Sequence, residues 1–178
     1  MDYTKSELRK IIRDSRAINP AKPLLISALL DSQIFKNAEI IASYFSYGNE
    51  LDTKELNSAI LKSGKILLLP RLSNDNSLIF VKWDGSSNSL IKNGNIFEPT
   101  GDAYSGQIDL MILPALAVDR SGKRLGQGGG SYDRTKSMDV KFRLAAINES
   151  ELLEKVPSES HDLPVDAVIT PSGLINLS

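Results

Sequence analysis

The chain has 178 residues, of which 41% are hydrophobic and 24% are charged, and its formal net charge at pH 7 is -1. These values are ordinary for a globular protein, and the lack of a basic excess argues against a partner such as nucleic acid or a membrane surface. The absence of cysteine excludes disulfides, thiol catalysis and cysteine zinc sites.

No apolar run approaches the roughly 18 residues that span a bilayer, and residues 1–10 lack the apolar core of a signal peptide. We therefore expect a cytoplasmic enzyme or binding protein that forms one domain over residues 1–178 and acts as a monomer.

The first segment predicts a helix. Thr4 and Glu7 form a capping box, in which each side chain satisfies the backbone N–H of the other residue. The apolar stripe expected to face the core consists of Leu8, Ile11 and Ile12. Four basic residues fall off this stripe, on the side expected to face water: Lys5, Arg9, Arg13 and Arg16.

The remaining chain alternates predicted helices with predicted strands. Helices are expected over residues 24–35 and 53–64, and a short one from Tyr132. Strands are expected over residues 39–47, 65–69, 78–83, 109–118, 143–147 and 167–170. Pro70 is expected to close the second of these strands. This order favours an α/β fold, a single layered domain with a mostly parallel sheet flanked by helices, Rossmann-like.

Residues 124–134, RLGQGGGSYDR, contain four glycines within five positions, shortly after a strong predicted strand. Glycines let successive backbone N–H groups converge on an anion. Arg124 and Arg134 bracket the run, and a guanidinium pairs well with phosphate oxygens. Asp133 is a hard oxygen ligand of the kind that Mg²⁺ prefers. The pattern favours a phosphate site over a flexible surface loop, although it is neither a Walker loop nor a dinucleotide fingerprint.

This string and the residues before it resemble the signature of the 5-formyltetrahydrofolate cyclo-ligases (methenyltetrahydrofolate synthetases). The matching stretch begins at Asp109 and reads DLMILPALAVDRSGKRLGQGGGSYDR. Further blocks match that family in the same order along the chain: Lys5 with Leu8-Arg9, Glu50, Pro70-Arg71, Glu98-Pro99, His161-Asp162 and Val165-Asp166.

The resemblance implies an α/β domain that converts 5-formyltetrahydrofolate, with ATP and Mg²⁺, to 5,10-methenyltetrahydrofolate, ADP and phosphate. Lys5, Arg9 and Arg124 would be catalytic, by positioning and neutralising the phosphates. The ATP-binding residues implied are Lys5, Arg9, Arg124, Leu125, Gly126, Gln127, Gly128, Gly129, Gly130, Ser131 and Tyr132. Asp133 and Asp166 would hold Mg²⁺, and Phe45 and Glu50 would contact the folate.

The residues also have plainer interpretations. Without the resemblance, Lys5 and Arg9 would be assigned to a solvated helix face, and Phe45 and Glu50 to an ordinary strand and loop. His161, the only histidine, is expected to order its loop rather than to act as a general acid. Trp83 either packs in the core or lines the folate cleft.

Two positions depart from the family pattern, Gln127 and Ser131. They keep a second hypothesis open, a binding module that holds folate or nucleotide without turnover. A third hypothesis is a kinase acting on another small molecule.

Overall fold

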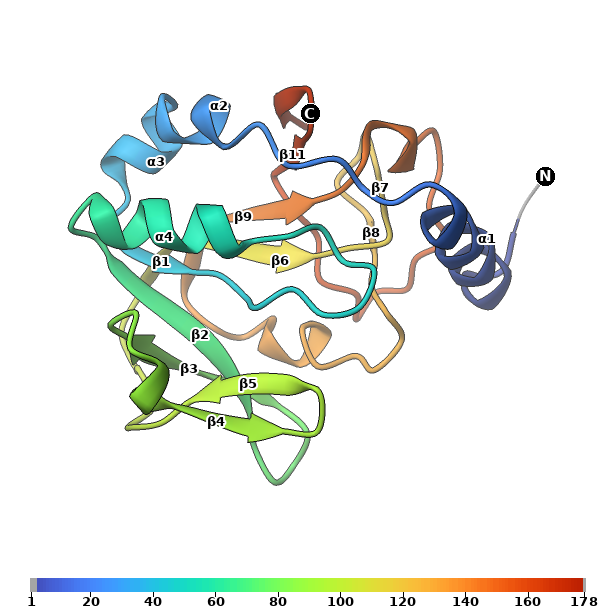
Figure 1. Ribbon diagram of the computed structural model, residues 1–178. Helices are drawn as coiled ribbons and strands as arrows, with labels where there is room; N and C mark the ends of the chain where they lie inside the picture. Colours follow the sequence, from blue (N-terminus) through green and yellow to red (C-terminus); the bar gives the residue numbers. More distant parts are fainter. Residues whose placement is uncertain (1–2, 178) are drawn as a thin grey trace.

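The computed structural model describes residues 3–177 and is built on a seven-stranded sheet (Figure 1). Its strands are β1 (Ile40–Ala42), β2 (Ile66–Leu72), β3 (Leu78–Trp83), β6 (Ile108–Pro114), β9 (Val140–Ala146), β11 (Ala167–Thr170) and β12 (Gly173–Asn176). They lie in the order β12-β11-β9-β6-β1-β2-β3, and all neighbours are parallel except the two edge pairs β11–β12 and β2–β3. The predicted α/β fold with a mostly parallel sheet is confirmed.

Two smaller sheets and several helices complete the fold. One sheet joins β10 (Leu152–Leu153), β7 (Ala117–Asp119) and β8 (Arg124–Leu125), and the other is a hairpin of β4 (Leu90–Asn93) and β5 (Ile96–Pro99). The helices are α1 (Lys5–Ile18), α2 (Ile26–Leu30), α3 (Gln33–Asn37), α4 (Lys54–Lys62) and the short 3-10 turns η1 (Ser87–Ser89), η2 (Asp133–Thr135) and η3 (Glu149–Glu151). None of the helices in the described part of the chain has the length and apolar character needed to cross a membrane.

The large sheet is buried on both faces, because successive strand residues point to opposite sides. Leu67 and Leu69 face one cluster, together with Phe35 and Ile60 of the helices α3 and α4. Leu68, between them, faces a second cluster. That second face is covered by the chain around η2 and by the segment before β11, through residues such as Tyr132, Met138, Leu163 and Val165.

Helix α1 begins as predicted, with both hydrogen bonds of the Thr4–Glu7 capping box present. Two predictions about its faces are wrong. Ile11 is 45% exposed, whereas Arg16, expected to face water, is only 3% exposed. The buried row runs at intervals of four residues through Leu8, Ile12 and Arg16, and the burial of Arg16 is made possible by an ion pair with Glu151.

Three predicted elements are shorter or divided. The helix expected over 24–35 is two short helices, because the Ser32 hydroxyl accepts a hydrogen bond from the Phe35 backbone N–H and starts α3. The strand expected over 109–118 divides into β6 and β7, which belong to different sheets. The strand expected over 39–47 ends at Ala42. The Tyr44 carbonyl beyond it accepts from side chains of Thr53 and Asn57 instead of from a strand.

Pro70 does not close its strand, since β2 continues to Leu72. The last pair between β1 and β2 is Ala42 with Leu68, so Pro70 has no β1 neighbour that needs its missing N–H. The hairpin β4–β5 was not predicted. Its two-residue turn has Gly94 at the first central position with φ of 61°, as a type II′ turn requires.

Candidate active site

A cavity of about 720 Å³ opens where β1, β2 and β6 end, which is the usual place for a ligand in a parallel sheet. Its walls come from α1, the glycine-rich loop 126–131, the loop 159–162 and the hairpin β4–β5. The predicted residues that line it are Lys5, Arg9, Phe45, Glu50, Arg124, Leu125, Gly126, Gln127, Gly128, Gly129, Gly130, Ser131, Tyr132 and Asp133. All predicted site residues except Asp166 are therefore brought together.

The glycine-rich loop lies against α1. Arg9 Nε donates to the Gly126 carbonyl at 3.0 Å, and Arg13 Nε donates to Gln127 Oε1 at 3.3 Å. Gly128 has φ of +110°, a conformation that side chains rarely adopt, and a Cβ there would lie 3.6 Å from the Arg9 guanidinium. That distance is ordinary van der Waals contact, so it is the positive φ that favours glycine where the loop meets the basic face of the helix.

Arg124 is buried beneath this loop. Its Nη1 donates to the Pro114 carbonyl at 3.1 Å and its Nη2 donates to Asp133 Oδ1 at 2.8 Å. The buried Nε has no hydrogen-bond partner within residues 3–177. A Cβ at Gly126 would lie 2.7 Å from Nη1, so a residue larger than glycine would displace the guanidinium. Arg124 lines the cavity, but its guanidinium is engaged in orienting Asp133.

The two predicted metal ligands differ in their positions. Asp133 Oδ1 accepts from Arg124 and from the Leu163 backbone at 3.0 Å, whereas Oδ2 has no protein hydrogen-bond partner in the described chain. Asp166 is not part of the cavity lining, and its Oδ2 accepts from the Arg143 backbone at 2.7 Å. Residues 3–177 contain no group of three or more His, Cys, Asp or Glu side chains placed to hold a metal.

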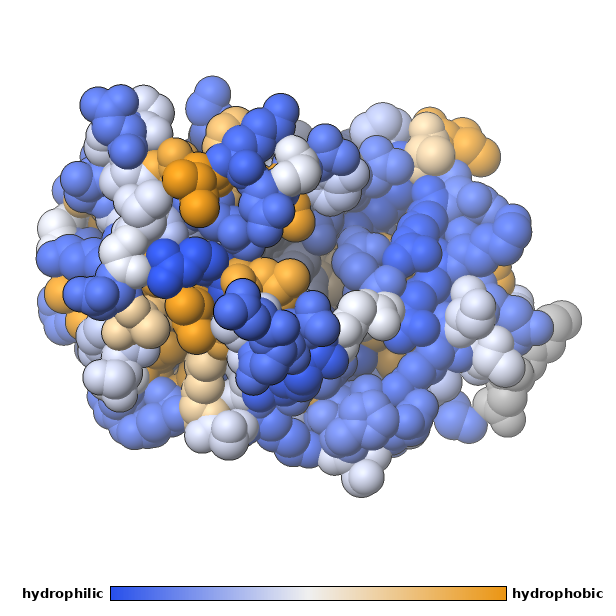
Figure 2. All heavy atoms as spheres, turned by 90° about the horizontal axis from the view of Figure 1, so that it is seen from below, coloured by the Kyte–Doolittle hydropathy of each residue, from blue (hydrophilic) through white to orange (hydrophobic). Residues whose placement is uncertain are grey.

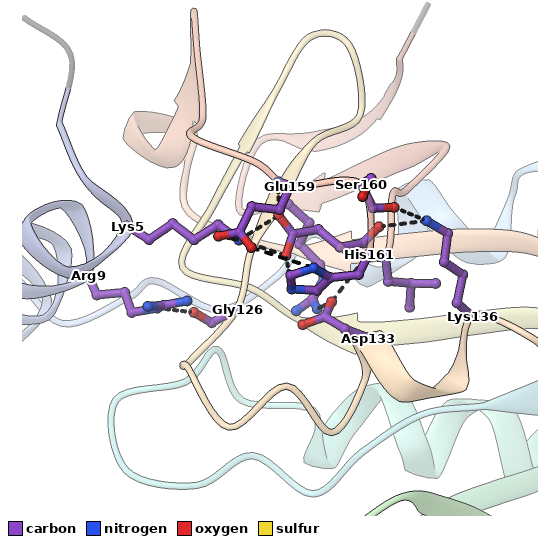
Figure 3. Close-up of polar contacts among 11 residues, drawn as sticks. Lys5, Arg9, Gly126, Asp133, Lys136, Glu159, Ser160 and His161 are labelled. Atoms are coloured by element: carbon purple, nitrogen blue, oxygen red, sulfur yellow. Dashed lines mark hydrogen bonds and ion pairs between the residues drawn. The ribbon is translucent and has the colours of Figure 1, made fainter.

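Lys5 is held by the loop opposite α1, as Figure 3 shows. Its Nζ lies 2.7 Å from Asp162 Oδ2 and 3.1 Å from Glu159 Oε1. Burial acts against the charged form, but these two carboxylates raise the pKa of Lys5. His161 lies between them, with Nδ1 3.5 Å from Glu159, and its side chain is 66% exposed. An anion that binds Lys5 must therefore compete with Glu159 and Asp162.

Glu50 follows the loop after β1 and faces the same cavity. Its Oε2 accepts from the Tyr47 backbone at 3.0 Å. Burial raises the pKa of Glu50, and the backbone bond from Tyr47 and the charge of Arg16 oppose this rise. Burial and the nearby Glu50 charge also raise the pKa values of Tyr44 and Tyr132. Glu50 is thus a carboxylate in a partly desolvated site beside two protonated phenols.

The wall near the hairpin is apolar. Three exposed side chains of the cavity lining are Leu72, Tyr47 and Ile96, at 43%, 49% and 47% exposure. Patches of hydrophobic side chains appear among hydrophilic ones on the face seen from below, the side on which the hairpin lies (Figure 2). Phe45 packs edge-on against Trp83, with ring centroids 5.1 Å apart. Trp83 itself is outside the lining, so of its two interpretations packing is confirmed.

Several lining residues escaped the sequence prediction. Glu159 and Asp162 are among them, and so are three residues of the hairpin, Asn93, Ile96 and Glu98. Buried Glu98 joins the hairpin to β2, since its Oε1 accepts from the Leu72 backbone at 2.9 Å. Gly94, which lies between Ile91 and Ile96 in the sequence, was the local signal for this hairpin.

Comparison with known proteins shows which family the chain is similar to. The model of the 5-formyltetrahydrofolate cyclo-ligase family matches residues 4–171. A 5-formyltetrahydrofolate cyclo-ligase of Escherichia coli K12 is 33% identical over 144 residues, covering 76% of this chain and 79% of that protein. The mitochondrial 5-formyltetrahydrofolate cyclo-ligase of Arabidopsis thaliana is 30% identical over 211 residues, covering 98% and 76%.

Solved structures show the same fold. The 5,10-methenyltetrahydrofolate synthetase of Aquifex aeolicus superposes with a TM-score of 0.82 at 29% identity, covering 97% of this chain and 92% of that one. The enzyme of the same name from Mycoplasma pneumoniae superposes with a TM-score of 0.62 at 18% identity, covering 95% and 99%.

Proposed function

This chain belongs to the 5-formyltetrahydrofolate cyclo-ligase family, and we propose that the cavity described above is where it closes the ring of 5-formyltetrahydrofolate. As an ATP-dependent ligase of this family, it converts that folate to 5,10-methenyltetrahydrofolate. The main support for this location is that a single cavity has a basic, glycine-rich wall and an apolar wall that includes a carboxylate. A single chain supplies both walls, and we propose that the protein acts as a monomer.

The basic wall is suited to the phosphates of ATP. Lys5 and Arg9 project from one face of α1, four residues apart, toward the glycine-rich loop and the loop 159–162 (Figure 3). The glycines of residues 126–131 carry no Cβ, so successive backbone N–H groups of this loop can add further donors. Phosphoryl transfer depends mainly on positioning and charge neutralisation, which these cations supply.

Asp133 fits a Mg²⁺ ion that also binds ATP. Its Oδ2 is without a hydrogen-bond partner among residues 3–177, and its side chain is 20% exposed. Mg²⁺ commonly takes one or two protein carboxylates and completes its shell with phosphate oxygens and water. When bound, it would neutralise phosphate charge as the γ-phosphoryl group is transferred. Asp166 is a proposed second ligand only by resemblance, since its carboxylate bonds the Arg143 backbone.

The apolar wall is suited to the folate. The aromatic rings of Phe45 and Tyr47 and the Ile96 side chain would cover its flat ring system. The Glu50 carboxylate accepts hydrogen bonds, and a pterin offers N–H donors.

The reaction needs the formyl oxygen to become a leaving group. In the proposed sequence that oxygen takes the γ-phosphoryl group and ADP departs. The second folate nitrogen then attacks the formyl carbon and releases its proton to solvent. Phosphate then leaves with the former formyl oxygen, and the methenyl bridge is complete. The role of Lys5 and Arg9 is to bind and orient the charged reactants, whereas Arg124 acts by orienting Asp133. No nucleophilic side chain is required.

The test is a spectrophotometric assay with 5-formyltetrahydrofolate, ATP and MgCl₂. We expect the near-ultraviolet absorbance of the methenyl product to rise in proportion to ADP release. Folate binding measured by calorimetry without ADP release would favour a binding module instead. ADP release only with a different acceptor would favour a kinase.

A further inference from the structure

The buried ion pair between Arg16 and Glu151 lies outside the cavity lining but contacts the segments that support it. Arg16 Nε and Nη2 each lie 2.7 Å from one Glu151 carboxylate oxygen, which is a two-pronged pairing. Asn148 also donates to both of these oxygens, from its backbone at 2.8 Å and its side chain at 3.0 Å. The carboxylate is therefore fully bonded and holds the guanidinium in one orientation.

The Arg16 guanidinium also bonds the backbone at the end of β6. Its Nη2 donates to the Ala115 carbonyl at 2.8 Å. The preceding residue, Pro114, lines the cavity, and its carbonyl accepts from Arg124, which orients Asp133. Arg16 and Arg124 thus bond consecutive carbonyls where the strand leaves the sheet.

The same guanidinium bonds the loop that carries Glu50. Arg16 Nη1 donates to the Asn49 carbonyl at 3.2 Å, one residue before Glu50. Arg16 itself lies in the last turn of α1, whose first turns carry Lys5 and Arg9. A single side chain therefore connects the helix of the proposed ATP wall to the loop of the proposed folate wall.

We propose that Arg16, held by Glu151, is a positioning residue that sets the Glu50 loop and the end of β6 relative to α1 for the reaction. This inference rests on the proposed role of Glu50 in binding folate. Because small displacements of binding groups have large effects on the rate of a two-substrate reaction, the pair is expected to affect folate binding without touching the folate.

The positive charge of Arg16 is also expected to support folate binding, through its effect on the pKa of Glu50. The groups that interact with Glu50 include Tyr44, Tyr132, Arg16 and Gln127. Arg16 is the cation among them, and its charge lowers the pKa of Glu50 against the effect of burial. Removing this charge should raise that pKa, so Glu50 would become protonated at a higher pH than in the wild type.

The experiment compares the double variant Arg16→Met/Glu151→Leu with the wild type in the absorbance assay. The double change leaves no unpaired charge in the core, so folding is preserved better than in either single variant. We expect the KM for 5-formyltetrahydrofolate to rise about tenfold with a smaller change in the KM for ATP. The pH below which folate KM increases should also move upward. The control Asp109→Asn/Lys141→Gln removes an ion pair at the opposite, amino-terminal ends of β6 and β9 and should change neither quantity.

A second variant, Arg16→Lys, keeps the charge and loses the two-pronged geometry. It should raise the folate KM while leaving its pH dependence as in the wild type, and it supplies the KM test if the double variant does not fold. A folded double variant with wild-type folate KM and pH profile would overturn the positioning role. A wild-type protein that forms no methenyl product would instead overturn the proposed function.

Discussion

The two walls of the cavity are built in opposite ways. The wall of α1 and the glycine-rich loop is polar, and its cations are already engaged by protein groups, Lys5 by Asp162 and Arg9 by the Gly126 carbonyl. The hairpin wall leaves Tyr47 and Ile96 about half exposed. The first wall is thus preorganised by hydrogen bonds, and the second leaves apolar surface uncovered.

The difference follows from what each wall is proposed to bind. Flexible basic side chains lose rotamer freedom when they bind phosphate, and existing hydrogen bonds already limit that freedom here. At Lys5 the anion must also compete with Glu159 and Asp162. A flat ring system gains affinity mainly by covering apolar surface, which requires that surface to be accessible beforehand. Changes to the polar wall should therefore affect ATP-dependent chemistry, and changes to the apolar wall should affect folate affinity alone.

The largest effect is expected from Asp133→Asn, which removes the carboxylate charge but keeps an oxygen for Arg124 and Leu163. Turnover should fall about 100-fold or more, because a neutral amide would not hold the Mg²⁺ that is proposed to neutralise the phosphate charge. Steady-state assays over a range of MgCl₂ concentrations check this. Asp14→Asn, on the exposed side of α1, is the matched control. Near-native turnover in Asp133→Asn would refute the metal assignment.

The next effect is a pH dependence that comes from Glu50. Since burial raises the pKa of Glu50, it takes up a proton at a higher pH than an ordinary glutamate does. The protonated form is a weaker acceptor, so folate KM should rise as the pH falls through this raised pKa. We expect Glu50→Gln to raise the KM about fivefold near neutral pH and to abolish this trend. Measurements between about pH 5 and pH 8 test it, with exposed Glu55→Gln as control.

An effect of similar size is expected on the apolar wall. Ile96 lines the cavity and Ile91 of the same hairpin does not, although the two are similarly exposed at 47% and 50%. Ile96→Ala should raise folate KM about fivefold, as expected for losing about 1 kcal/mol of apolar contact, while ATP KM stays constant. Ile91→Ala should leave both constants unchanged. Equal effects of the two substitutions would show that hairpin stability, rather than folate contact, is being measured.

The smallest effect concerns the start of the polar wall. Thr4 caps α1 and accepts from the Glu7 backbone at 3.3 Å, directly before Lys5. Thr4→Ala should lower the free energy of unfolding by about 1 kcal/mol, which chemical denaturation can measure. Ser6→Ala, at an exposed position in the same turn, should change it by less. Equal losses would mean that the capping box does not contribute.

Local signals in the sequence predicted part of the polar wall and none of the apolar wall. The capping box located the start of α1, and the glycines located the loop that approaches it, because both depend on backbone groups only a few residues apart. Phe45 and Glu50 could be assigned only through family resemblance, since a phenylalanine in a strand and a glutamate in a loop have many uses. The hairpin depended on a single turn glycine, Gly94, and was missed.

The sequence by itself determined six of the seven strands of the large sheet, the loop that can accommodate an anion, and the family to which the chain is similar. Only the tertiary structure decided which charges meet. Lys5 bonds Asp162 across 157 positions, and Arg16 is buried because Glu151, 135 positions away, neutralises it. Asp166 bonds the Arg143 backbone and stays out of the cavity lining. Helical periodicity places a side chain on a face of its own helix, but the free energy of burying a charge depends on a partner that folding brings from elsewhere in the chain.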